Sequence, residues 1–362
     1  MRVLFAMPGF HRVSRGAEIA LQSVARQLAH DPAWSVTVAG TGAPDPDEPY
    51  DYVRLPVVRR ERLERLPQVP FFRNEYAYEE ATFAPGLARW YRPSQFDLTV
   101  TASYPFVSWV LRRGRHRPPH VFITQNGDWP AQSDDAEFKF FACDGLVCTN
   151  PGFYERNRTR WPSVLIPNGA DTSKFTPGLG DRTRFGLPAD ATVVLMASAL
   201  IETKRVDAAV RAVAEVPGAY LVVAGDGPMR DQIDALAAAH LPGRFARTVV
   251  SSDEMAELYR CADVFLHTTL HESFGNVYVE ALATGLPIVA HRSETLEWIL
   301  GDDADLVDTT DQQELVCALK RACDDPSTQA DRDARHAVAA ARFDWTHVSA
   351  QYEAFFRQVV ER

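Results

Sequence analysis

Short apolar runs alternate with helical patterns along the whole chain. Residues 3–7 form an apolar run that ends at Pro8-Gly9, which predicts a buried first strand. Residues 17–29 then carry apolar side chains at the spacing of one helix face, and residues 35–39 predict the next strand. Strand, glycine-bearing loop, helix and strand together predict a βαβ unit. Further strands are predicted at residues 98–102, 120–124, 145–148 and 164–166.

The same alternation begins again after Asn168. Pro177, Gly178 and Gly180 interrupt regular structure, so we expect a junction within residues 171–188. The last apolar stripe, at residues 346–360, predicts an amphipathic helix that packs across this junction. Strands are predicted at residues 192–197, 219–224, 247–250, 264–267 and 287–290, and helices at 206–214, 229–238, 253–261, 276–284 and 295–300.

This order predicts the α/β class, with two doubly wound, Rossmann-like domains that face a cleft. The expected domains are residues 1–170 and 171–342, followed by a C-terminal helix at 343–362 that crosses back to the first domain. Because doubly wound sheets bind ligands at the carboxyl ends of their strands, the loops that follow strands are the places to search for a site.

The composition limits the possible partners. Residues 1–170 contain 20 Lys+Arg against 18 Asp+Glu, and residues 171–362 contain 18 against 30, so the net charges are +2 and −12. The acidic balance argues against nucleic acid as a partner. The Arg-rich runs at residues 54–65 and 112–117 are either solvated faces or a surface for an anionic acceptor or the inner face of a membrane.

Cysteine usage and apolar runs predict the compartment. Five scattered cysteines match no zinc or redox spacing, which is typical of reduced thiols in a cytosol. Neither a signal peptide nor a membrane-spanning run is apparent, so a cytoplasmic location is expected, with peripheral membrane contact as a further option.

The motif with the clearest chemistry follows the strand predicted at 264–267. Gly275 opens a helix, and the uncovered N–H groups at such a helix start suit a phosphate. Glu272 precedes this helix and Glu280 lies more than one turn inside it, so the two carboxylates flank a phosphate-sized gap. They are suited to accept hydrogen bonds from a sugar and a ribose, although spacing alone equally fits an ordinary helix start.

Two further loops carry weaker signals. Gly16 opens the first helix and allows close approach of a phosphate or an acceptor, but it also fits a plain helix start. Asn126 lies in the polar loop at residues 124–130, which is expected at the cleft and also fits ordinary turn chemistry. No pair of histidines has zinc spacing, and the D-x-D pairs at 45–47 and 303–305 lie in turn-like acidic stretches, so no metal site is predicted.

The run from His271 to Leu282 resembles the E-x7-E motif of the retaining GT-B glycosyltransferases, family 4. Its neighbours at residues 258–264 and 285–290 resemble the same family, as do the inter-domain segment at 166–171 and the strand–turn segment at 222–228. The resemblance covers the chain from end to end and is most specific between Ile166 and Ala290. It implies the GT-B fold, with an acceptor-binding N-terminal domain and a C-terminal domain that binds a nucleotide-diphosphate sugar.

The resemblance also implies a role for each matching residue. Glu272 would bind donor sugar hydroxyls, Glu280 would bind the ribose, and Lys204 would pair with the diphosphate. Backbone groups near Val250 would read the nucleotide base. The backbone amides that would hold the donor belong to Phe274, Gly275 and Asn276, with Val277 in the same donor-binding set.

The N-terminal loops match the family in position but not in every residue. Residues 15–18, which include Gly16, resemble the family's Gly-Gly-x-Glu entry with arginine at the first glycine. Asn126 occupies the loop in which family members often carry a histidine near the reacting carbon. Ala199 replaces the arginine that usually provides a second phosphate contact, so Arg205, where the family often has glycine, is the predicted substitute.

The predicted function is therefore metal-independent transfer of a hexose, with retention of configuration, from a nucleotide-diphosphate sugar to a hydroxyl acceptor. A glycan, a lipid carrier and a natural product are all compatible acceptors, and no cofactor is expected beyond the donor substrate. The predicted catalytic residues are Glu272, Lys204 and Asn126. Two alternatives stay open: a sugar-nucleotide epimerase on the same fold, and a non-catalytic subunit that binds nucleotide sugars.

Overall fold

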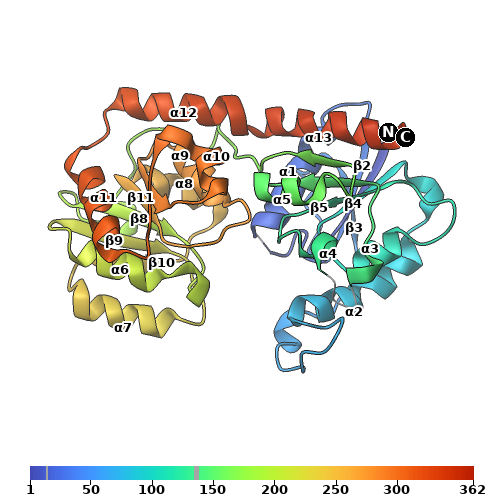
Figure 1. The fold of residues 1–362 in the computed structure, drawn as a ribbon, viewed down its shortest axis with the longest axis horizontal. Helices are drawn as coiled ribbons and strands as arrows, with labels where there is room; N and C mark the ends of the chain where they lie inside the picture. The colour runs from blue at the N-terminus through green and yellow to red at the C-terminus, as the bar shows by residue number, and fades with distance from the viewer. Residues whose placement is uncertain (14, 134–137) are drawn as a thin grey trace. The chain divides into compact units, whose positions relative to one another are not determined.

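The alternating pattern folds into two parallel sheets, each covered by helices on both faces (Figure 1). The computed structural model describes residues 1–13, 15–133 and 138–362. They divide into an N-terminal unit, Met1–Asn168 with Trp345–Arg362, and a C-terminal unit, Gly169–Asp344. The predicted α/β class with two Rossmann-like halves is confirmed.

The N-terminal unit is built on a seven-stranded sheet with the order β3-β2-β1-β4-β5-β6-β7. Its strands are β1 (Arg2–Ala6), β2 (Ser35–Gly40), β3 (Asp51–Arg54), β4 (Leu98–Thr101), β5 (His120–Ile123), β6 (Gly145–Cys148) and β7 (Ser163–Leu165). Its α-helices are α1 (Gly16–Ala29), α2 (Glu75–Trp90), α3 (Phe106–Leu111), α4 (Trp129–Gln132), α5 (Pro151–Asn157) and α13 (Trp345–Val360), with short 3-10 turns η1 (Arg60–Arg62), η2 (Pro93–Gln95) and η3 (Phe138–Phe140).

Alternation along β1 explains how helices come to cover both faces of this sheet. Val3 and Phe5 belong to one apolar cluster with α1 and α13, whereas Leu4 and Ala6 belong to another with α2 and α3. The C-terminal helix α13 therefore completes the core of the N-terminal unit, and Figure 1 shows it beside α1. Its buried stripe is Trp345, Val348, Tyr352, Phe355, Phe356 and Val359.

The C-terminal unit is built on a six-stranded sheet with the order β10-β9-β8-β11-β12-β13. Its strands are β8 (Thr192–Ala197), β9 (Ala219–Ala224), β10 (Phe245–Thr248), β11 (Val264–His267), β12 (Ile288–His291) and β13 (Ala304–Val307). Its α-helices are α6 (Val206–Ala214), α7 (Arg230–His240), α8 (Ser252–Arg260), α9 (Asn276–Ala283), α10 (Glu294–Leu300), α11 (Gln312–Asp324) and α12 (Gln329–Phe343), with 3-10 turns η4 (Thr183–Phe185), η5 (Glu202–Lys204) and η6 (Gly301–Asp303).

Both sheets reverse their strand order once, and this reversal selects the place for a ligand. The reversal lies between β1 and β4 in the N-terminal unit and between β8 and β11 in the C-terminal unit. Loops that leave neighbouring strands in opposite directions create a crevice at such a point. The loops after β8 and β11 carry the motif residues Lys204 and Glu272.

Some predicted boundaries and elements are wrong. The strand predicted at 247–250 is β10, Phe245–Thr248, so Val249 and Val250 lie in the following loop. The edge strands β3 and β13 were not predicted, nor were the helices α2–α5, α11 and α12. The two units divide after Asn168, just before the region in which the junction was expected. None of the described helices is both long and apolar enough to cross a membrane.

Candidate functional site

The loop between β11 and α9 is shaped by one glycine. Gly275 has φ +88°, a conformation that glycine adopts without strain. A Cβ at this position would lie 2.5 Å from a ring carbon of Tyr278 and 2.9 Å from Cγ of Glu272. Any other residue would therefore push the loop away from the helix, which gives the glycine at this helix start a steric reason.

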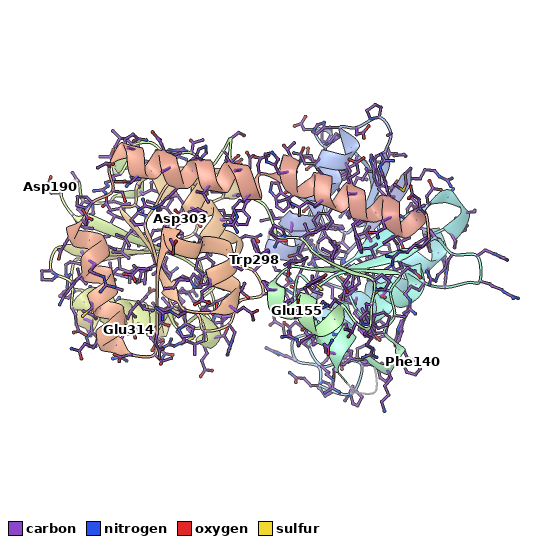
Figure 2. All side chains as sticks on the ribbon, turned by 45° about the horizontal axis from the view of Figure 1, so that its top comes forward. Phe140, Glu155, Asp190, Trp298, Asp303 and Glu314 are labelled. Atoms are coloured by element: carbon purple, nitrogen blue, oxygen red, sulfur yellow. The ribbon has the colours of Figure 1, made fainter. Side chains whose placement is uncertain are left out.

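The side chain of Phe274 anchors this loop in the core of the C-terminal unit. Its ring is buried and packs edge-to-face against Trp298 and Phe343, each with 6.3 Å between ring centroids. Trp298 is labelled in Figure 2. Because the side chain of Phe274 is held in the core, the neighbouring backbone at Gly275 is fixed relative to the start of α9.

The N-terminus of α9 is suited to an anion. Gly275 is the N-cap residue and, as glycine, offers no side-chain cap to this helix end. The first N–H groups of a helix lack intrahelical partners, and the helix dipole places partial positive charge there. Asn276 and Val277 are the first two helical residues and are partly buried, so these two predicted donor-binding residues lie at the anion-binding end.

Lys204, the predicted partner of the diphosphate, and Glu272, the predicted partner of the sugar, form an ion pair. Nζ of Lys204 lies 2.5 Å from Oε2 of Glu272, and each side chain is about one-fifth exposed. Lys204 ends the turn η5 after β8, and Glu272 follows β11, so the pair spans the switch point. Each of the two charges therefore has an opposite charge beside it.

Glu280 is held by a tyrosine that the motif does not contain. The hydroxyl of Tyr259, a fully buried residue of α8, donates to Oε2 of Glu280 over 3.0 Å. Burial raises the pKa of Glu280, while the bond from Tyr259 and the nearby charge of Lys174 lower it. The carboxyl group is therefore oriented before any ligand binds. Tyr259 lies in the family-like segment 258–264, but the sequence analysis did not single it out.

Two sequence models together match nearly the whole chain. One is described as glycosyl transferases group 1 and matches residues 181–339, and the other as glycosyltransferase family 4 and matches residues 14–174. The chain belongs to glycosyltransferase family 4. The predicted family is therefore confirmed.

Known relatives agree with this family. Lipopolysaccharide core biosynthesis glycosyltransferase LpsE of Rhizobium meliloti is 31% identical over 230 residues, which cover 61% of this chain and 66% of that protein. The chain thus spans slightly less than two thirds of this relative. Sucrose-phosphate synthase from Thermosynechococcus elongatus has a TM-score of 0.79 at 20% identity, covering 99% of this chain and 98% of its own. HepE of Anabaena, solved with UDP-glucose, has a TM-score of 0.73 at 17% identity, with 99% and 100% covered. These likenesses show the GT-B fold.

Arg205 is hydrogen-bonded within the C-terminal unit, and its predicted contact with a phosphate stays a prediction. Its guanidinium donates to the carbonyl oxygens of Thr268 and Thr309 at 3.1 and 3.0 Å, and to Oγ1 of Thr309 at 3.0 Å. These bonds tie the loops after β11 and β13 together. Because all three acceptors are uncharged, the guanidinium keeps its positive charge. The left-handed backbone of Arg205, with φ +51°, explains why glycine is common here in the family.

Val250 lies in the loop after β10, at the carboxyl edge of the sheet. Its side chain packs against the core of the C-terminal unit, whereas Val249 is exposed. Binding of the nucleotide base by backbone groups near Val250 stays a prediction.

Gly16 and Asn126 lie in the N-terminal unit. Gly16 is the exposed first residue of α1, and Asn126 is an exposed residue that lines a cavity of about 550 Å³ together with Arg15 and Glu18. Their predicted contacts with the donor and the reacting carbon remain predictions. Within the same loop Asp128 is buried and accepts hydrogen bonds from Arg156 and Asn157, so it stabilises the loop.

The two Arg-rich runs differ in what their side chains do. In the run 112–117, Arg112 and Arg113 donate to the carbonyl oxygens of Phe140 and Tyr91, and Arg117 pairs with Asp144 at 2.6 Å. Three of its arginines therefore bind atoms of the N-terminal unit, and Arg113 and Arg115 are exposed, which agrees with the alternative of a solvated face.

The run 54–65 is different. Arg59, Arg62 and Arg65 are exposed, and Val58 and Leu66 beside them are each 43% exposed. Glu61 and Glu64 lie between these arginines and are exposed as well, so basic, acidic and apolar side chains share one exposed segment of the N-terminal unit.

Proposed function

We propose that this chain transfers a hexose from a uridine diphosphate sugar to a hydroxyl acceptor, with retention of configuration and without a divalent metal. The observation that carries the proposal is the N-terminus of α9 after Gly275, flanked by the Lys204–Glu272 pair and by the Tyr259–Glu280 pair. The choice of uridine is supported by HepE of Anabaena, which was solved with UDP-glucose.

The diphosphate of the donor would occupy the helix end. Two negative phosphates gain from the helix dipole and from the first N–H groups of α9, beginning at Asn276. Lys204 would exchange its partner Glu272 for a phosphate oxygen, which adds a charge-assisted hydrogen bond. The cation is already beside the site, so only a short movement of its side chain is needed.

The two carboxylates would then bind hydroxyl groups at opposite ends of the donor. Glu272, released by Lys204, accepts from hydroxyls of the sugar. Glu280, held in place by Tyr259, accepts from the ribose. A carboxyl group oriented in advance loses less conformational entropy on binding, which favours affinity for the nucleoside.

In the chemical step, the bond between the anomeric carbon and the phosphate oxygen breaks and the acceptor oxygen forms the new bond on the same face. The acceptor proton passes to the leaving phosphate, so atoms and charges balance. Lys204 and the start of α9 stabilise the charge that develops on the leaving diphosphate. This protein cation would take the role that a metal has in other transferases.

The assignments are tested by donor binding and turnover. Lys204→Ala and Glu280→Ala should each weaken binding of UDP-glucose by about 10- to 100-fold, because each removes a hydrogen bond to a charged group worth about 1.5–3 kcal/mol. Lys320→Ala and Glu297→Ala, at exposed positions on α11 and α10, are matched controls that should leave affinity unchanged. Near-normal binding and turnover in Lys204→Ala and Glu280→Ala would refute the assignments.

Simple incubations distinguish the proposed transferase from the two alternatives. A sugar-nucleotide epimerase converts the donor without an acceptor, whereas a transferase hydrolyses it slowly or leaves it unchanged. A non-catalytic subunit binds the donor and shows neither transfer nor hydrolysis. Retention is read from the anomeric proton of the product by NMR, and activity that persists in EDTA supports metal independence.

The exposed Arg-rich segment also supports contact with an anionic membrane surface. Each basic side chain near such a surface contributes about 1 kcal/mol, and the apolar neighbours Val58 and Leu66 add contact with the interface. Replacing Arg59, Arg62 and Arg65 by glutamine should abolish cosedimentation with vesicles that contain 30% phosphatidylglycerol. Equal cosedimentation of the variant and the native chain would refute this contact, and neutral phosphatidylcholine vesicles are the control.

A further inference from the structure

A histidine at the carboxyl edge of the C-terminal sheet lies next to the candidate donor site. His291 ends β12, and β12 lies between β11 and β13 in the sheet. The loop after β11 carries Glu272 and leads to Gly275 at the start of α9. The side chain of His291 is 20% exposed, so solvent protons can reach it. This histidine lies outside the motif at residues 271–282.

The ring of His291 binds the loop after β13 through one nitrogen. Its Nδ1 lies 3.2 Å from the backbone nitrogen of Thr309 and 3.2 Å from Oγ1 of the same residue. A backbone N–H group can only donate, so Nδ1 accepts this hydrogen bond and carries no proton. Thr309 is only 2% exposed, so water has little access to replace the histidine as its partner. The neutral form of His291 therefore holds this loop.

Thr309 connects His291 to the turn that carries Lys204. Its Oγ1 and its carbonyl oxygen each accept a hydrogen bond from Arg205 at 3.0 Å. Arg205 also donates to the carbonyl oxygen of Thr268. The hydroxyl of Thr268, a fully buried residue, donates to the carbonyl oxygens of Lys204 and Arg205 at 3.2 and 2.8 Å. A continuous set of hydrogen bonds thus runs from His291 to the backbone of Lys204.

Protonation of His291 would change its partner. A protonated Nδ1 is a donor, so it cannot accept from the N–H group of Thr309. The carboxylate of Asp308 is close, with Oδ1 3.9 Å from Nδ1, and Thr310 binds the same Oδ1 through its N–H and hydroxyl groups. An imidazolium ring would turn toward this carboxylate, because a charge-assisted hydrogen bond replaces two opposed donors. The buried N–H group of Thr309 would then lose its partner.

Three charged or titratable groups face His291 from other segments. They are Asp308 after β13, Arg205 before α6 and His271 after β11. Burial lowers the pKa of His291, the charge of Asp308 raises it, and the charges of Arg205 and His271 lower it. The net effect is a pKa below the usual value, so His291 is neutral at pH 7 and gains its proton only below about pH 6.5.

We propose that His291 is a positioning residue for donor binding: its neutral form holds Thr309 and, through Arg205, the turn of Lys204, and its protonation releases them. This role rests on the function proposed above, in which Lys204 touches the diphosphate and His291 does not. Affinity for the donor should therefore fall in mildly acid solution. UDP-glucose itself adds no such pH dependence, because neither of its phosphates is a terminal phosphate with a second proton to lose.

The test measures binding of UDP-glucose by calorimetric titration at about pH 7.5 and at about pH 5.5. The native chain should lose affinity about five- to tenfold between them, the loss expected for one hydrogen bond. His291→Asn keeps an acceptor near the position of Nδ1 that does not titrate, so it should lose less than about twofold. His291→Leu has no acceptor and should bind weakly at both pH values.

Two further variants test the cause of the pH dependence. Asp308→Asn removes the charge that favours protonation of His291, so the loss of affinity should move to lower pH. His240→Asn, at an exposed position of α7, is the matched control and should behave like the native chain. His271 is kept in every variant, so its titration contributes equally. The same loss of affinity in His291→Asn as in the native chain, or no loss in the native chain, would overturn the proposal.

Hydrogen exchange measures the release of the loops without a ligand. After correction for the intrinsic effect of pH, residues 268–275 and 305–311 should exchange faster at the lower pH in the native chain but not in His291→Asn. Thermal melting at both pH values confirms that each variant is folded. Equal exchange in the two chains would overturn the proposal even if UDP-glucose binds.

The two measurements also distinguish this proposal from the proposed transfer. A chain that binds UDP-glucose with the same pH dependence in native and His291→Asn forms retains the transfer, and this inference fails. A chain that binds no UDP-glucose, but whose loops are released by acid only when His291 is present, retains the role of His291 in holding these loops, and the proposed transfer fails.

Discussion

Replacing Arg205 by alanine and by glycine separates two effects of this residue on the C-terminal unit. The side chain makes three hydrogen bonds to the loops after β11 and β13, and the backbone lies in the left-handed region with φ +51°. Alanine removes the bonds and keeps the backbone strain. Glycine removes the bonds and relieves the strain, which costs about 1 kcal/mol for a residue with a Cβ.

The expected magnitudes follow from these contacts. Hydrogen bonds to a charged donor contribute about 1.5–3 kcal/mol each when buried, but Arg205 is partly exposed and its bonds are not independent. We therefore expect Arg205→Ala to destabilise by about 2–3 kcal/mol in total and Arg205→Gly by about 1–2 kcal/mol. For a unit of this size, about 1 kcal/mol shifts Tm by roughly 2–4 °C.

Scanning calorimetry of the full-length chain measures both variants, and the transition of the C-terminal unit is identified by its shift with UDP. Arg211→Ala, at an exposed position of α6, is the control and should change stability by less than about 0.5 kcal/mol. The reasoning about strain is refuted if the glycine variant is no more stable than the alanine variant. The reasoning about hydrogen bonds is refuted if both variants melt like the native chain.

Three further predictions concern buried polar groups. Tyr259→Phe removes the hydrogen bond to Glu280 and should weaken UDP binding about five- to tenfold by calorimetric titration; unchanged affinity would show that the bond does not orient the carboxyl group. Burial lowers the pKa of both His120 and His267 to about 3, so the unfolded chain binds more protons than the folded chain below pH 6.5. Each histidine should therefore cost about 2 kcal/mol of stability between pH 7 and pH 5, and urea unfolding of His267→Gln should show a weaker loss than the native chain; an identical pH profile would contradict this. The raised pKa of Glu80 has the opposite effect on the pH dependence of stability. As a neutral acid Glu80 stabilises the fold, and this contribution is lost as the pH rises from 4.5 through 8. Glu80→Gln should thus gain stability relative to the native chain between pH 6 and pH 9, and a constant difference in Tm would refute the assignment.

Sequence patterns predicted the central strands well because those strands are apolar on both faces. β8, β9 and β11 have the bounds that the apolar runs indicate. The missed strands β3 and β13 are four-residue edge strands with mixed burial, so they lack a continuous apolar run. Short edge strands depend on pairing with a neighbour, which a local pattern does not contain.

Two of the missed helices, α2 and α12, escaped prediction for other reasons. α2 contains Pro85 and Gly86, which are typical of breaks in a helix, yet it is held by a buried face. α12 buries only Ala339 and Phe343 among its 15 residues, so its apolar stripe is too weak to predict. In both cases tertiary packing determines the helix more than local propensity does.

The candidate site was predictable where chemistry depends on local spacing. The spacing of Glu272, Gly275 and Glu280 along one strand–loop–helix segment is visible in the sequence, and the structure adds a steric reason for the glycine. The hydrogen bond from Tyr259 and the direction of the Arg205 side chain depend on contacts between segments far apart in the chain. Such contacts have no local signature.

The placement of Arg205 has a consequence for the leaving group. Position 199 is alanine, and the guanidinium of Arg205 is held by Thr268 and Thr309, so Arg205 contributes positive charge while several of its N–H groups are already used. Charge on a departing diphosphate then depends more heavily on Lys204 and on the helix dipole of α9. Lys204 must also leave Glu272 before it can act, so donor binding breaks one ion pair to form another. Exchange of Glu272 for a phosphate as the partner of Lys204 is favourable because the diphosphate carries two negative charges. Release of Glu272 is therefore coupled to binding of the donor.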